Sequence, residues 1–93
     1  MEFNEFDAAD YIDDAEDVVA FLNAALEMGG ASALPRALGT IARSKGMTSV
    51  AEKTGLGREH LYNALRDGGN PTLATLEKVL SACGVRIKLE AMR

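Results

Sequence analysis

The stretch from Met47 to Arg66, MTSVAEKTGLGREHLYNALR, constrains this chain more than any other, because its spacing predicts two short helices joined by a tight turn. Thr48 is the expected N-cap of the first helix, since its hydroxyl can accept from the free amides of the first turn. Gly55 is expected to end that helix in the left-handed conformation that glycine adopts readily. The second helix is expected from Arg58 to Arg66. Such a pair forms a helix-turn-helix, which offers its second helix to the DNA major groove.

The second helix is predicted to have two chemically different faces. Leu61 and Leu65 are four residues apart and are expected to be buried. On the opposite face, Arg58 can bind a guanine with two hydrogen bonds, and Asn63 can bind an adenine in the same way. The alternative is that this polar face is simply solvated. The candidate base contacts are Arg58, Glu59, Tyr62 and Asn63, and the candidate phosphate contacts are Arg43, Thr48, Ser49, Lys53 and Arg66.

The formal net charge of −4 conceals a strong asymmetry along the chain. Residues 1–30 carry nine acidic side chains and no basic one, which leaves all ten basic residues and five acidic ones in residues 31–93. This division predicts two partners of opposite charge, DNA for the basic part and a basic protein for the acidic part. The acidic N-terminal arm, residues 1–14, also carries large apolar residues that a solvated tail would not need. We expect the arm to lie on its own domain or on a partner, and the candidate protein contacts are Phe3, Phe6, Asp7, Asp10, Tyr11, Asp13 and Asp14.

Three further helices are predicted by apolar residues at helical spacing, over residues 14–28, 32–45 and 72–83. Glycines follow each of them and are expected to stop them. With the central pair, they predict a five-helix, repressor-like all-α domain over residues 15–84. The expected apolar stripe of the first helix is Val18, Val19, Leu22, Ala25 and Leu26, and the expected core is Leu38, Ile41, Val50, Ala51, Leu61, Leu65, Leu76, Val79 and Leu80.

Residues 85–93 change to a period of two, in which Val85, Ile87 and Leu89 alternate with charged residues. This alternation is typical of a β-strand. A solitary strand cannot satisfy its backbone amides, so we expect it to pair with another chain. The partner is either the same strand of a twin subunit, with Val85, Ile87 and Leu89 as dimerisation residues, or the sheet edge of a different protein. The alternative is a tail that packs on its own helices.

The residues offer little for catalysis, metal binding or membrane insertion. His60 is the only histidine, and it has no cysteine or carboxylate pair at catalytic or metal-binding spacing, so a surface histidine is the preferred interpretation. Cys83, the only cysteine, is interpreted as a buried apolar residue. We therefore expect no enzymatic activity, no metal and no cofactor. The chain has no apolar run near the ~20 residues of a membrane span, and its start is acidic, so we expect a cytoplasmic protein with no membrane partner.

The flanks of the central motif resemble those of the repressor-type helix-turn-helix domains of the Cro and Xre class. In that class, a loop with glycine and proline leads into a T-L-x-x-L-x-x-x-L-x-x-x-G-V helix, here Thr72 to Val85. Nearly the whole chain resembles the addiction-module antidote family, a HigA-like group of antitoxins, most tellingly in FDAADY, ALG-x-IARS-x-GMT and GNPTLAT-x-x-K-V-L. One departure is Gly57, which stands where a serine usually caps the second helix of the motif.

The resemblance implies two activities for one chain. A partner toxin of the RelE/ParE superfamily would be encoded next to it, and the helix-turn-helix would repress the shared operon. The first hypothesis is thus a dimeric type II antitoxin that neutralises its toxin with the acidic arm and binds operator DNA. The alternative is a stand-alone Xre-type transcriptional regulator with no toxin. A neighbouring gene for a short basic protein would separate the two.

Overall fold

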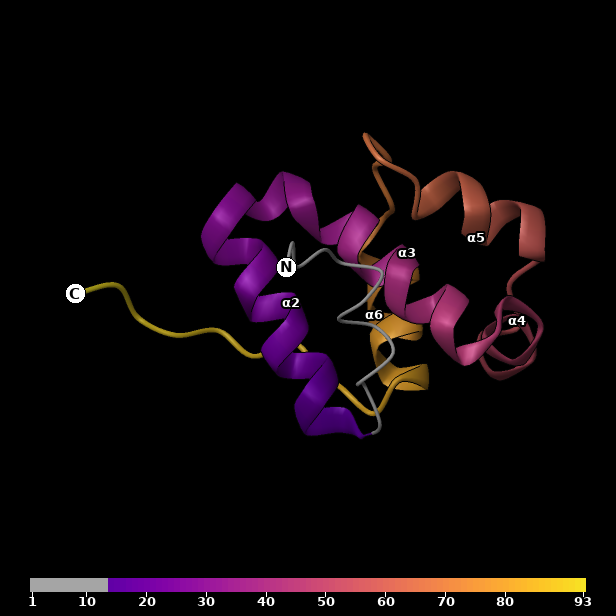
Figure 1. Ribbon diagram of the computed structural model, residues 1–93, viewed down its shortest axis with the longest axis horizontal. Coiled ribbons are helices and arrows are strands. Elements are labelled where there is room, and N and C mark those ends of the chain that lie inside the picture. Colours follow the sequence, from indigo (N-terminus) through magenta and orange to yellow (C-terminus); the bar gives the residue numbers. More distant parts are fainter. Residues whose placement is uncertain (1–13) are drawn as a thin grey trace, which may run out of the picture.

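The computed structural model describes residues 14–93, and this part of the chain folds into five α-helices (Figure 1). This confirms the predicted helical class, and each helix begins within two residues of its predicted start. None of the helices in residues 14–93 is both long enough and apolar enough to cross a membrane. The elements are α2 (Ala15–Gly29), a 3-10 turn η1 (Ala31–Ala33), α3 (Leu34–Lys45), α4 (Met47–Thr54), α5 (Arg58–Ala64) and α6 (Leu73–Ala82).

Local sequence sets where the first helices begin. Asp14 caps α2 by accepting a hydrogen bond from the Asp17 amide at 2.9 Å, and the Asp17 carboxylate accepts from the Asp14 amide at 3.4 Å. The prediction that Thr48 caps α4 is wrong, because Gly46 occupies the cap position with φ of 99° and Thr48 lies inside the helix. Met47 is only 5% exposed, so it belongs to the core and the helix begins with it.

The core lies between α3 and the helices that cross it. Its largest fully buried side chains are Leu38, Ile41, Leu61, Leu65, Val18 and Val79, and the predicted core is confirmed, with Ala51 and Leu76 half-buried at its edge. The predicted apolar stripe of α2 includes two residues that are not buried, since Val19 and Leu26 are 40% and 36% exposed. The reason is that α2 lies at the side of the bundle, where it packs on α3 and η1. Cys83 is buried as predicted, and this burial raises the pKa of its thiol, an effect that Lys45 and Lys53 partly offset.

The predicted C-terminal β-strand is wrong. After α6 the chain turns at Gly84, with φ of 80°, and the Val85 amide donates to the Leu80 carbonyl at 2.9 Å. Residues 85–93 then have no regular secondary structure, and no strand occurs anywhere in residues 14–93. The physical reason is that a strand needs a neighbouring strand, and this part of the chain provides none. Val85 is half-buried, whereas Ile87 and Leu89 are 41% and 89% exposed.

A glycine sets the close approach of α3 to α5. A Cβ atom built on Gly39 would collide with the Leu65 carbonyl oxygen and would lie 3.2 Å from a guanidinium nitrogen of Arg43. Gly39 has ordinary helical geometry, so its role is spatial and does not depend on a positive φ. Because α3 and α5 are in contact, this close approach fixes how α5 is held against the core.

Candidate nucleic-acid interface

The turn between α4 and α5 is held by three consecutive residues. Gly55 adopts the left-handed conformation with φ of 73°, as predicted, and its amide donates to the Ala51 carbonyl at 2.9 Å. The Thr54 hydroxyl donates to the Val50 carbonyl at 2.8 Å and accepts from the Leu56 amide at 3.2 Å. Leu56 itself packs against the core. The direction of α5 is therefore set by hydrogen bonds on both sides of Gly55, and the contribution of Thr54 is an addition to the predicted turn.

The two predicted faces of α5 are confirmed. Leu61 is fully buried and Leu65, just beyond the helix, is 1% exposed. Figure 1 shows α5 at the outer edge of the bundle, far from the acidic helix α2. This geometry leaves one side of α5 open to a large ligand. The exposed residues on and after it include all four candidate base contacts, Arg58, Glu59, Tyr62 and Asn63, together with Arg66.

The candidate phosphate contacts lie on three different elements. Thr48 and Ser49 are in the first turn of α4, exposed and half-buried respectively. Arg43 is exposed in the last turn of α3, and its guanidinium donates to the Thr40 hydroxyl at 3.5 Å. Lys53 is in the last turn of α4, beside α6, and lines a separate depression. The structure therefore brings Lys53 together with α6 residues rather than with the exposed face of α5.

A short polar network links α5 to the start of α6. The Thr72 hydroxyl caps α6 by accepting from the Thr75 amide at 3.1 Å, and it donates to the Thr75 hydroxyl at 3.1 Å. The Thr75 oxygen lies 3.5 Å from Nε2 of His60, on α5. His60 is thus an exposed histidine, as interpreted from the sequence, but it also faces the buried Thr75. The only sequence signal for this network is the pair of threonines that begins α6.

A shallow hollow lies beside this network, at the end of α5. Its volume is about 330 Å³, and Asn63 is one of the residues along its edge. A candidate base contact therefore lies next to the loop that precedes α6, so this loop belongs to the same surface. The lining residues are His60, Asn63, Ala64, Asn70, Pro71 and Thr72.

Replacing Gly57 with serine should stabilise the fold. Gly57 caps α5 in the extended conformation of an ordinary N-cap, with φ of −69°, and has no side chain to bind the free amides. A Cβ at this position would meet nothing within 4 Å. We expect Gly57→Ser to raise the free energy of unfolding by about 0.5–1 kcal/mol, measured by urea denaturation. The matched change Gly46→Ser should destabilise, because φ there is 99°; a lower urea midpoint for Gly57→Ser would contradict the assigned cap.

Most of the predicted protein-binding arm lies outside the described residues. This applies to Phe3, Phe6, Asp7, Asp10, Tyr11 and Asp13. Asp14 is described, and its carboxylate is engaged in capping α2. Within residues 14–93, no group of three or more histidine, cysteine, aspartate or glutamate side chains is arranged to hold a metal ion.

Comparison with known proteins identifies the family. A family model described as "probable addiction module antidote protein" matches residues 2–91. The chain belongs to this family. The chain is 35% identical over 92 residues to an uncharacterized protein of Haemophilus influenzae strain Rd, an alignment that covers 99% of this chain and 95% of the relative. No solved structure matches this chain. Membership of an antidote family implies a toxin partner and favours a non-enzymatic role.

Proposed function

We propose that this protein is the antitoxin of a type II toxin–antitoxin module. It binds and neutralises a basic RelE/ParE-like toxin, and it represses its own operon through α4 and α5, which act as a Cro/Xre-type, HigA-like helix-turn-helix. It works in the cytoplasm as a homodimer. The observation that carries the proposal is the match of the antidote family model to residues 2–91, which spans both the acidic arm and the two helices.

The exposed face of α5 supports the DNA-binding part of the proposal. A helix in the major groove reads base edges with side chains from its first turns, where Arg58 and Asn63 are exposed here. Arg58 would bind guanine and Asn63 adenine, while Glu59 and Tyr62 would contact neighbouring bases. Arg43, Thr48, Ser49 and Arg66 would bind phosphates and so fix the register without reading sequence.

The acidic arm supports the toxin-binding part. Residues 1–13 carry five acidic side chains and no basic one, so they would steer toward a cationic protein surface. Phe3, Phe6 and Tyr11 would provide the buried aromatic anchors that dominate the energy of many interfaces. Asp14 would have a different role, because its carboxylate is already engaged in capping α2.

The proposed contacts of the homodimer lie in the residues after α6. A domain of this size buries only about 60–65% of its unfolded surface, so further burial through a second copy is favourable. The exposed Ile87 and Leu89 and the half-buried Val85 are the proposed contacts. A two-fold dimer would present two copies of α5, which fits an operator with two half-sites.

The proposal requires a gene for a small basic protein beside this one, and co-expression with that protein tests it. The neighbour alone should arrest growth, and this chain should restore growth and co-purify with the neighbour. The triple change of Phe3, Phe6 and Tyr11 to alanine should abolish both effects, whereas Met28→Ala, at a position 89% exposed on α2, should preserve them. Persistent growth arrest while this chain is present in soluble form would overturn the proposal.

A further inference from the structure

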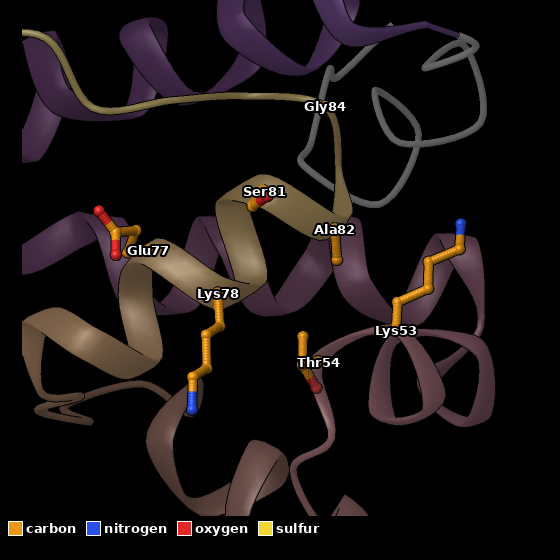
Figure 2. Close-up of a pocket in the computed structure, with 7 residues that line it drawn as sticks. All are labelled: Lys53, Thr54, Glu77, Lys78, Ser81, Ala82 and Gly84. Atoms are coloured by element: carbon orange, nitrogen blue, oxygen red, sulfur yellow. The ribbon is translucent and has the colours of Figure 1, made fainter.

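A depression between α4 and α6 is not used by any activity proposed above. Its volume is about 600 Å³, and it is open to solvent. Figure 2 shows Thr54 of α4 facing Ala82 of α6, with Lys53 and Lys78 on opposite sides of this pair. The small side chain of Ala82 and the absence of one at Gly84 leave room for an aromatic ring. The lining residues are Lys53, Thr54, Glu77, Lys78, Ser81, Ala82 and Gly84.

The charges around this depression favour an anionic ligand. Lys53 and Lys78 line it directly, and the carboxylate of the one acidic lining residue, Glu77, points away from Thr54 in Figure 2. A basic toxin would be repelled here, whereas an acidic segment would be attracted.

The chain's own N-terminal residues form an acidic segment that can reach this depression. Gly84, which lines the depression, packs against the first residue of α2: a Cβ on Gly84 would lie 3.2 Å from the Cβ of Ala15. The described part of the chain, which starts at Asp14, therefore begins near the edge of the depression. An extended segment as long as residues 1–13 reaches at most roughly 45 Å, so every part of the depression is within its range.

We propose that residues 1–13 dock in the depression between α4 and α6 of their own chain, with the acidic side chains beside Lys53 and Lys78 and an aromatic ring over Ala82. Three observations favour this occupant. Its charge is opposite to that of the two lysines, the described chain begins near the depression, and the small residues Ala82 and Gly84 leave space in it. Docking does not require a toxin. If the arm also binds the toxin, as proposed above, the toxin must displace it from this site.

Paramagnetic relaxation enhancement of amide signals by a spin label, measured in the full chain without toxin, tests the proposal. A nitroxide is attached at Asn4→Cys, while Cys83 stays unlabelled because it is 5% exposed. The amide signals of Thr54 and Ala82 should be lost, and they should return in high salt, which screens the attraction. Retention of both signals at low salt would overturn the proposal. Loss of both signals on an isotope-labelled chain from a label on a second, unlabelled copy would also overturn it, because the arm would then dock between chains.

Charge reversal identifies the docking residues. Lys53→Glu with Lys78→Glu should restore the Thr54 and Ala82 signals in the spin-labelled chain. The matched change Lys88→Glu, in the exposed tail, should leave them lost. Should the double variant fail to fold, Ala82→Leu, which fills the floor of the depression, should have the same effect. Continued loss of the signals in a folded double variant or in Ala82→Leu would contradict the proposed site. Growth rescue from the toxin is measured separately, so failure of docking and failure of the antitoxin function are distinguishable.

Discussion

Replacing Gly39 with alanine should lower the free energy of unfolding by about 2 kcal/mol. Alanine normally stabilises a helix interior by about 1 kcal/mol relative to glycine. At Gly39 the new methyl group would collide with the Leu65 carbonyl oxygen, which belongs to the backbone and cannot rotate away. Overpacking of this kind costs about 1–3 kcal/mol and occasionally more, so we expect the collision to outweigh the helical gain. Thermal denaturation should show a fall in the unfolding midpoint of roughly 10 °C.

The matched control for this change is Gly57→Ala. The new Cβ meets nothing within 4 Å at that position and φ is ordinary, so the lower entropy of the unfolded chain should roughly offset the poorer capping by alanine, and the unfolding midpoint should change little. An unfolding midpoint of Gly39→Ala at or above that of the wild type would show that α3 and α5 are not held in this close contact.

Replacing Arg58 or Asn63 with alanine should each weaken binding to the operator by about 10- to 100-fold. Each change would remove a two-bond contact to a base, which contributes about 1–3 kcal/mol of discrimination. Both residues are exposed, so thermal stability should be unchanged. The measurement is fluorescence anisotropy with DNA from upstream of the gene, at one fixed salt concentration because phosphate contacts depend strongly on salt.

Two exposed residues of the same types provide the controls for the DNA measurement. Arg86→Ala, after α6, and Asn23→Ala, on α2, should bind the operator as the wild type does. A smaller and different effect is expected for Arg66→Ala, which should weaken binding to all DNA sequences alike if it contacts a phosphate. Unchanged affinity for both Arg58→Ala and Asn63→Ala would remove the proposed base readout.

Features that depend on a few neighbouring residues could be predicted from the sequence. Asp14 and Gly55 mark helix ends through their own side chain or lack of one, and the structure places them at those ends. Leu61 and Leu65 are buried and the polar residues of α5 are exposed because a spacing of three to four residues defines a helix face. These features are enough to locate the candidate DNA-binding surface.

Features that depend on distant contacts could not be predicted in this way. We expect glycine to be required at position 39 because the Leu65 carbonyl approaches it, and these two residues are far apart in the sequence. The contact of His60 with Thr75 likewise joins two separate helices. The prediction of a C-terminal strand was wrong for a related reason. Alternating residues favour a strand only where a second strand is available, and residues 14–93 provide none.

The central claim is that one small helical protein binds a toxin and DNA through separate surfaces. Its most direct test is a strain that carries the toxin gene and a reporter under the operon's own promoter, in which growth and reporter activity are measured together. The double variant Arg58→Ala, Asn63→Ala should restore growth as the wild type does and should no longer repress the reporter. Loss of both activities in a folded double variant, or retention of both, would contradict the claim.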